Sequence, residues 1–137
     1  MIHITRKVHF NAAHKLFKPE WTDEKNAEVF GKCSNPNWHG HNFELFVTVK
    51  GKPDPETGFV IDLKDLKSII ENEVVDLVDH KNLNLDVAFM HGIMASTENF
   101  AIGIWKQLQP KLTAPNYQLH SVKLYETERN FVEYFGE

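Results

Sequence analysis

Two segments near the N-terminus alternate between apolar and polar residues, which is the pattern of strands with one buried face. Between residues 2 and 14 the even positions are mostly apolar and end at His14, and between residues 39 and 50 the odd positions form a similar face that begins with His39 and His41. If the two strands pair antiparallel, the end of the first lies beside the start of the second. We therefore predict that the three histidines meet on one face of a sheet.

The segment that joins these strands, residues 15 to 32, shows no sustained period. We expect a long loop there, with room for one helical turn. Loops of this length are uncommon in compact domains and are often functional. This one leads directly to Cys33, the only cysteine of the chain.

Two helices and a hairpin are predicted for the rest of the chain. Asp62 can cap a helix whose apolar residues keep one face as far as about residue 79, and Ser96 can cap a second helix. Residues 117 to 126 and 131 to 135 are rich in Tyr, Val, Leu and Phe, and a four-residue turn separates them. These two segments are typical of a hairpin.

The resulting element order, β-β-α-α-β-β, indicates an α+β fold in one domain that spans residues 1–137. Two helices between two hairpins predict a four-stranded antiparallel sheet with both helices on one face. The other face would carry a mixture of polar and apolar residues, and the outer strands would be unpaired. Such a sheet invites closure by oligomerisation.

The composition is that of an ordinary soluble globular protein, with 42% hydrophobic and 25% charged residues. The net charge of -4, without a cluster of Lys or Arg, argues against nucleic acid or an anionic membrane as a partner. No apolar stretch approaches the roughly 20 residues that span a bilayer, and the N-terminus does not resemble a targeting signal. A single cysteine implies no oxidising compartment, so a cytoplasmic location is expected.

Three neutral imidazoles with one vacant position describe a catalytic zinc site, and His14, His39 and His41 could form one. Cys33 lies six positions before His39 and admits two interpretations. It could be the fourth ligand of a closed structural zinc site, because Cys with three His is a known structural set. Alternatively, a nearby metal could lower the thiol pKa from about 8.5 and make Cys33 a general base.

Five motifs carry a resemblance to a known family: Phe10-Asn11-Ala12-Ala13-His14, Phe30-Gly31-Lys32-Cys33 followed after five residues by His39-Gly40-His41-Asn42, Asp79-His80-Lys81-Asn82-Leu83, Ser96-Thr97-Glu98-Asn99, and Tyr125-Glu126-Thr127. Together they resemble the 6-pyruvoyl-tetrahydropterin synthases over nearly the whole chain. These enzymes have the tunnelling fold, with the same β-β-α-α-β-β order. Trp38 and Asn84 are among the positions at which the sequence departs from the family pattern.

The resemblance implies a zinc-dependent lyase that converts 7,8-dihydroneopterin triphosphate to 6-pyruvoyl-tetrahydropterin with loss of triphosphate. It implies zinc on His14, His39 and His41, and a homohexamer of two stacked trimers, each closed into a barrel, with sites between subunits. The other roles that it implies are a general base at Cys33, a proton relay through Asp79 and His80, a pterin anchor at Glu126, and a pterin pocket lined by Thr97 and Glu98.

Local sequence alone favours simpler roles for several of these residues. Asp79 and His80 would end a helix, where an imidazolium complements the helix dipole. Glu98 would lie in the first turn of a helix, and Glu126 at an exposed strand end. These interpretations stay open at this point.

Three rival functions also remain. The first is 6-carboxytetrahydropterin synthase of queuosine biosynthesis, which has the same fold, zinc and substrate but also releases acetaldehyde. Its members usually have three residues between the Cys and the His-Gly-His motif, and this chain has five. The second is a non-enzymatic, zinc-stabilised oligomer that binds pterin. The third, a hydrolytic metalloenzyme, ranks low because the chain has no helical His-Glu-x-x-His motif.

Overall fold

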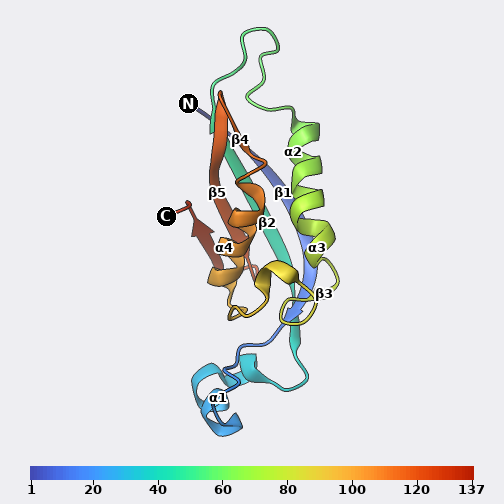
Figure 1. Ribbon diagram of the computed structural model, residues 1–137, viewed down its shortest axis with the longest axis vertical. Coiled ribbons are helices and arrows are strands. Elements are labelled where there is room, and N and C mark those ends of the chain that lie inside the picture. The colour runs from blue at the N-terminus through green and yellow to red at the C-terminus, as the bar shows by residue number, and fades with distance from the viewer.

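A computed structural model describes residues 1–137, and its centre is one long sheet (Figure 1). Three long strands and one short strand form most of it: β1 (Ile2–His14), β2 (His39–Gly51), β5 (Tyr117–Tyr125) and the four-residue β6 (Phe131–Tyr134). Two strands of two residues each complete the sheet, β3 (Lys81–Asn82) and β4 (Thr113–Ala114). The strand order is β3-β1-β2-β5-β4, and β6 pairs with a separate part of β5.

The expected four strands are therefore present, but the prediction of a four-stranded, wholly antiparallel sheet was wrong. The sheet has six strands, and β3 lies parallel to β1, with Ala12 opposite Lys81. β3 and β4 are too short for any alternation of apolar and polar residues to reveal them. The mixed α+β class and the two long hairpins are as predicted.

Both predicted helices form where their caps indicated, and both cover the same face of the sheet (Figure 1). The first runs through α2 (Leu63–Ile70), a π-helical turn (Glu71–Val75) and α3 (Asp76–Val78), and the second is α4 (Thr97–Leu108). The Asp62 carboxylate accepts from the Lys64 N–H, and the Ser96 hydroxyl accepts from the Asn99 N–H. A short 3₁₀ turn (Ala88–Met90) lies in the connector between them.

The segment between β1 and β2 projects beyond one end of the sheet (Figure 1) and contains more structure than predicted. It includes α1 (Asp23–Phe30), an eight-residue helix capped by Thr22, followed by a 3₁₀ turn (Gly31–Ser34). The expectation of a long loop was therefore wrong for Asp23–Ser34, where the helical structure exceeds the single turn that the sequence suggested. Only one residue of α1 is buried, the polar Asn26, so this helix has no apolar stripe that a sequence pattern could reveal.

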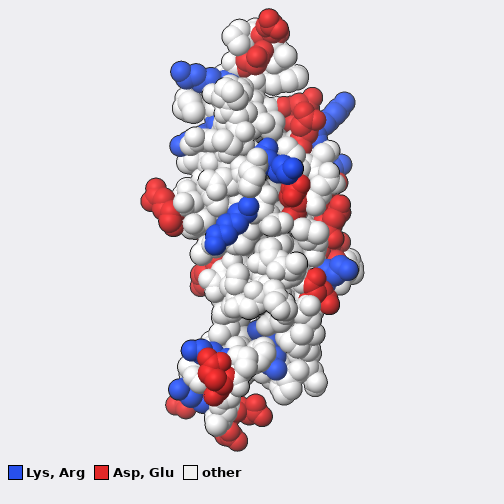
Figure 2. All heavy atoms as spheres, viewed as in Figure 1, with Lys and Arg blue, Asp and Glu red and all other residues white.

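The core lies between the sheet and the two covering helices. The even positions of β1 and the odd positions of β2 face this core, as predicted, and the aromatic rings of Phe10, Phe43 and Phe100 pack against one another at its centre. Acidic and basic side chains are interspersed over the face that Figure 2 shows. None of the helices is both long and apolar enough to cross a membrane.

Candidate metal centre and active site

β1 and β2 pair residue by residue over their whole length, and this register assembles the three histidines. His14 lies opposite His39, and Ala12 lies opposite His41. The ring centroids of the three imidazoles are 4.5, 4.9 and 5.0 Å apart. One nitrogen from each ring lies within 4.8 Å of the other two, so the three side chains could hold a metal ion. The predicted convergence is confirmed.

The hydrogen bond of His14 decides which of its nitrogens could bind a metal. Its Nδ1 lies 2.7 Å from the Ala95 carbonyl oxygen. A carbonyl can only accept, so Nδ1 carries the proton and donates, and Nε2 keeps its lone pair. In metal-binding histidines generally, a hydrogen bond from the ring nitrogen that does not bind the metal fixes the tautomer and the orientation of the ring.

Three ring nitrogens are buried and have no hydrogen-bond partner: His14 Nε2, His39 Nδ1 and His41 Nε2. Buried polar atoms are normally paired, because an unpaired one costs about 1–3 kcal/mol. Three such atoms on adjacent rings need an explanation. A metal ion that accepted all three lone pairs would provide it, and imidazole donors suit several first-row metals, zinc among them.

The environment favours the neutral form of these imidazoles, which is the form that binds a metal. Burial lowers the pKa of His14, although its hydrogen bond to Ala95 opposes this shift. Burial and the neighbouring His14 both lower the pKa of His39. Burial also lowers the pKa of His41, while the carboxylate of Glu126 acts in the opposite direction.

Glu126 follows directly after β5 and lies beside the histidines. One carboxylate oxygen is 3.3 Å from His41 Nε2, without the alignment of a hydrogen bond, and the other accepts from the Thr97 hydroxyl. Thr97 is buried at the start of α4, and the exposed Glu98 follows it. All three acidic or hydroxyl side chains line one hollow of about 260 Å³. The residues expected to contact a pterin are therefore together, next to the metal ligands.

Cys33 is half-buried in the 3₁₀ turn that precedes β2, and its carbonyl accepts from the Leu16 N–H at 2.7 Å. Its sulfur does not belong to the cluster of ligand atoms, which contains only nitrogens. The structure thus does not form the closed site in which Cys33 is a fourth ligand. Three histidines without the thiol leave a coordination position open.

Asp79 and His80 lie at the edge of the sheet, beside β1. Asp79 Oδ1 accepts from the Asn11 N–H at 3.0 Å and lies 3.0 Å from His80 Nδ1. The hydrogen bond from Asn11 is the main cause that lowers the pKa of Asp79. His80, with a positive φ of 60°, exposes 76% of its side chain. His80 shares a cleft of about 560 Å³ with His41. Within one chain, no hydrogen bond joins Asp79 or His80 to Cys33.

Ala95 is the one residue of the centre that the sequence did not suggest. Its contribution is a carbonyl group, which every residue carries, so no side-chain signal could have identified it. Its position follows from the fold, because Ala95 immediately precedes the Ser96 cap of α4.

Comparison with known proteins agrees with the geometry of this centre. Residues 3–137 match the family model described as 6-pyruvoyl tetrahydropterin synthase. The chain belongs to the 6-pyruvoyl tetrahydropterin synthase family. The synthase of Pongo abelii is 47% identical over 134 residues, which cover 98% of this chain and 91% of that protein. The solved structure of the Caenorhabditis elegans synthase has a TM-score of 0.91 at 38% identity and covers 99% of this chain and 96% of that one.

The chain is accordingly a lyase of the 6-pyruvoyl tetrahydropterin synthase type. A protein named 6-carboxy-5,6,7,8-tetrahydropterin synthase, from Rickettsia typhi, is 28% identical over 149 residues and is thus much less similar. This difference in identity agrees with the five residues between Cys33 and His39, a spacing that also favoured the pyruvoyl-forming type.

Proposed function

We propose that this chain converts 7,8-dihydroneopterin triphosphate to 6-pyruvoyl-tetrahydropterin with loss of triphosphate, and that it uses zinc bound by His14, His39 and His41. The observation that carries the proposal is the set of three buried, unpaired ring nitrogens that face one another. The thiol of Cys33 stays outside this set. A substrate oxygen therefore has a place to bind.

Zinc held there would act as a Lewis acid toward oxygens of the substrate side chain and make an adjacent C–H bond more acidic. Cys33, which lies in the 3₁₀ turn that precedes β2, is the base that removes this proton. Asp79 holds His80 through the contact between Oδ1 and Nδ1, so the imidazole is oriented to pass protons in a relay. No external redox cofactor is needed, because the rearrangement is internal to the substrate.

Glu126 anchors the pterin in this proposal. A carboxylate accepts two N–H bonds from an aminopyrimidinone edge, which is a charge-assisted and directional contact. The Thr97 hydroxyl already donates to one of its oxygens and orients the group, and Glu98 lines the same hollow. Because Glu126 lies beside His41, a pterin ring bound to Glu126 would lie next to the metal site. The side chain of the substrate would then be free to reach the metal.

The working form is proposed to be a homohexamer, a dimer of trimers, whose sites lie between subunits. The support is that Cys33 and the Asp79–His80 pair have no hydrogen bond to each other within one chain. Mixing two inactive variants, Cys33→Ala and His80→Gln, tests this arrangement. Shared sites predict partial recovery of activity after subunit exchange, whereas sites within one chain predict none.

The decisive experiment incubates the purified protein with 7,8-dihydroneopterin triphosphate and identifies the pterin product by mass spectrometry. The 6-pyruvoyl product with free triphosphate supports the proposal. A 6-carboxy product with acetaldehyde would assign the chain to queuosine biosynthesis instead. Cys33→Ala should reduce the rate of triphosphate release by about 100-fold or more, which is the usual loss when a general base is removed. An unchanged rate in this variant would remove Cys33 from the mechanism, and binding without turnover in the native protein would indicate a pterin-binding module.

A further inference from the structure

The uncovered face of the sheet carries a pair of stacked histidines, away from the metal ligands. His3 lies near the start of β1, at the opposite end of this strand from His14, and His120 lies in β5. Their ring centroids are 4.4 Å apart, and their planes differ by 12°. Because the planes are nearly parallel, the nitrogen lone pairs, which lie in these planes, do not converge on one point. The pair is therefore a stack and not a second set of metal ligands.

The stack crosses the strand that lies between its two members. β2 separates β1 from β5 in the sheet. Leu119 and Ser121 pair with neighbouring residues of β2, and His120 between them is the extra residue of a bulge. A bulge redirects the side chain that it carries. The two imidazoles therefore join β1 to β5 over β2.

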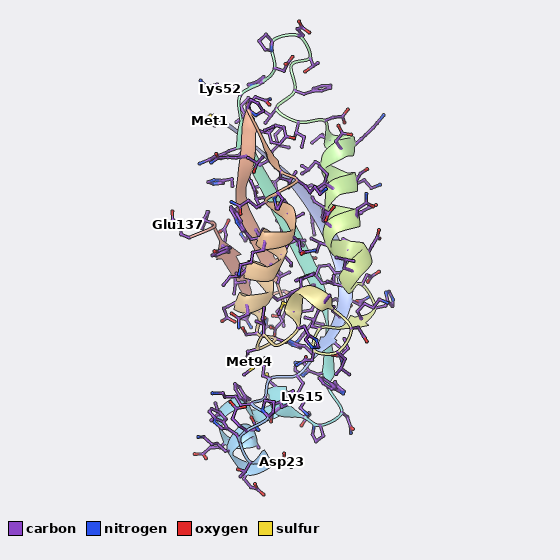
Figure 3. All side chains as sticks on the ribbon, viewed as in Figure 1. Met1, Lys15, Asp23, Lys52, Met94 and Glu137 are labelled. Carbon is purple, nitrogen blue, oxygen red and sulfur yellow. The ribbon has the colours of Figure 1, made fainter.

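The ring of His120 also contacts the C-terminal tail, residues 135–137. Phe135 directly follows β6, and its ring packs against the imidazole at an angle of 68°, with centroids 5.6 Å apart. In Figure 3, Met1 and Glu137 both lie on the side of the sheet away from α2. The start of β1 and the end of the chain are thus connected through one imidazole.

These contacts involve both free edges of the sheet. β3 pairs only with Ala12 and Ala13, so the rest of the outer side of β1 has no strand beside it. β6 pairs with β5 alone and is an edge on the other side. Unpaired edges are where a second copy of a chain can add its own strand. His3 belongs to the first edge strand and Phe135 follows the second, so the stack influences the position of both edges.

Burial and charge make this stack sensitive to acid. Burial lowers the pKa of His120, and positive charge on His3 or Lys50 lowers it further. Glu133 of β6 acts in the opposite direction, Glu137 of the tail lines the same cleft as His120, and the parts of α4 and β4 in this cleft are uncharged. An open form that exposes His120 to water therefore binds a proton more readily. The stack is fully stable above about pH 6.5 and is lost as the pH falls toward the lowered pKa.

We propose that the stack of His3 on His120 is an acid-sensitive clasp, which holds the two edges of the sheet in the form that lets copies of the chain join. At neutral pH the clasp is closed and the edges pair between copies. In mild acid His120 takes up a proton, the rings separate, and the subunits dissociate. This inference rests on the proposed homohexamer and adds to it the control of assembly by pH.

Sedimentation velocity of the full-length, zinc-loaded protein at one concentration, between about pH 7.5 and 5.5, tests the clasp. We expect reversible dissociation of the native protein, because a lowered pKa weakens the clasped form by up to about tenfold per pH unit for each histidine. His120→Tyr keeps an aromatic ring beside His3 and Phe135 and does not titrate in this range, so this variant should stay assembled. A native protein that stays assembled in acid, or a His120→Tyr variant that dissociates as the native protein does, would overturn the inference.

His9→Gln is the matched control. His9 is another exposed histidine on the uncovered face of β1, but its ring is not part of the stack. Loss of this imidazole should leave the pH of dissociation at the native value. An equal change in His9→Gln and His120→Tyr would show a general effect of charge on this face and would also overturn the inference.

Hydrogen exchange of residues 131–137, measured by mass spectrometry, tests the clasp independently of assembly. After correction for the intrinsic pH dependence of exchange, protection of this segment should fall by up to about tenfold between about pH 6.5 and 5.5 in the native protein and stay constant in His120→Tyr. Equal protection of the native protein at both pH values would contradict the clasp. A native protein that is monomeric at neutral pH would instead overturn the proposed homohexamer, and the exchange of this segment would then decide the clasp alone.

Discussion

Mild acid should destabilise the metal-free protein, because burial in the folded state favours the neutral form of the three clustered histidines. Burial lowers their pKa values below the ordinary 6.5, whereas in the unfolded chain they protonate freely through that pH. The unfolded state then binds more protons than the folded state. Stability therefore rises with pH in this window: it is fully present above pH 6.5 and is lost as pH falls toward the lowered pKa values.

The size of the effect has a ceiling that follows from linkage. A histidine that stays neutral in the folded state loses about 1.4 kcal/mol of stability between about pH 7.5 and 5.5, so three lose at most about 4 kcal/mol. His14 is 2% exposed, and the side chain of His41 is 18% exposed, so solvent screens them weakly. His120, outside the cluster, also has a pKa that burial lowers, so it adds to the loss in this window, whereas Asp54 and Asp79 have lowered pKa values and titrate in a separate, more acidic window.

Urea unfolding of the chelator-treated protein at a series of pH values and one protein concentration measures this slope. His14→Gln should reduce the loss by up to about 1.4 kcal/mol, because one titrating group is gone. His91→Gln, the same replacement at an exposed position outside the cluster, controls for loss of an imidazole at the surface. A free energy of unfolding that is flat from about pH 7.5 to 5.5 would refute a neutral histidine cluster.

Three further outcomes are expected. Ser96→Ala should lower the free energy of unfolding in urea by about 1 kcal/mol, because the N-cap bond to the Asn99 N–H is lost. Gly51→Ala should cost about 1–3 kcal/mol in the same assay, because the added Cβ would clash with the Asn116 carbonyl oxygen. Free zinc at about 1,000 times its Kd should stabilise the native protein by about 4 kcal/mol in calorimetry, and a chelator or His14→Ala should remove this gain.

The parts of the fold with a strong local signal were predictable. Alternation fixed which faces of β1 and β2 are buried, and chain direction then placed His14 opposite His39. This succeeded because the pairing contains no bulge, so the side-chain parity holds from one end to the other. The bulge that the sheet does contain lies between β2 and β5, near Thr48, away from the ligands.

Elements held by polar contacts were not predictable from patterns. α1 is organised by Asn26, whose amide exchanges two hydrogen bonds with the Lys18 main chain, and by the Thr22 cap. β3 exists because a loop distant in sequence lies against β1. Neither an isolated amide nor a two-residue pairing changes the hydrophobic period, which is the signal that sequence reasoning uses. Conversely, departures from a family pattern at Trp38 and Asn84 were visible, but their contacts with Lys15 required the structure.

The same features that would make the centre bind a metal also lower the stability of the metal-free fold. Each buried, unpaired ring nitrogen destabilises the metal-free fold, and the rings cannot relieve this by protonation, because burial disfavours the charged form. His14 has a second constraint, since its Nδ1 proton is held by the Ala95 carbonyl and its Nε2 has no other partner. A metal ion bound by the three nitrogens would remove all three penalties together. In the proposed function, folding stability and readiness for catalysis are therefore coupled at this centre, and measurements on the metal-free protein report on the site.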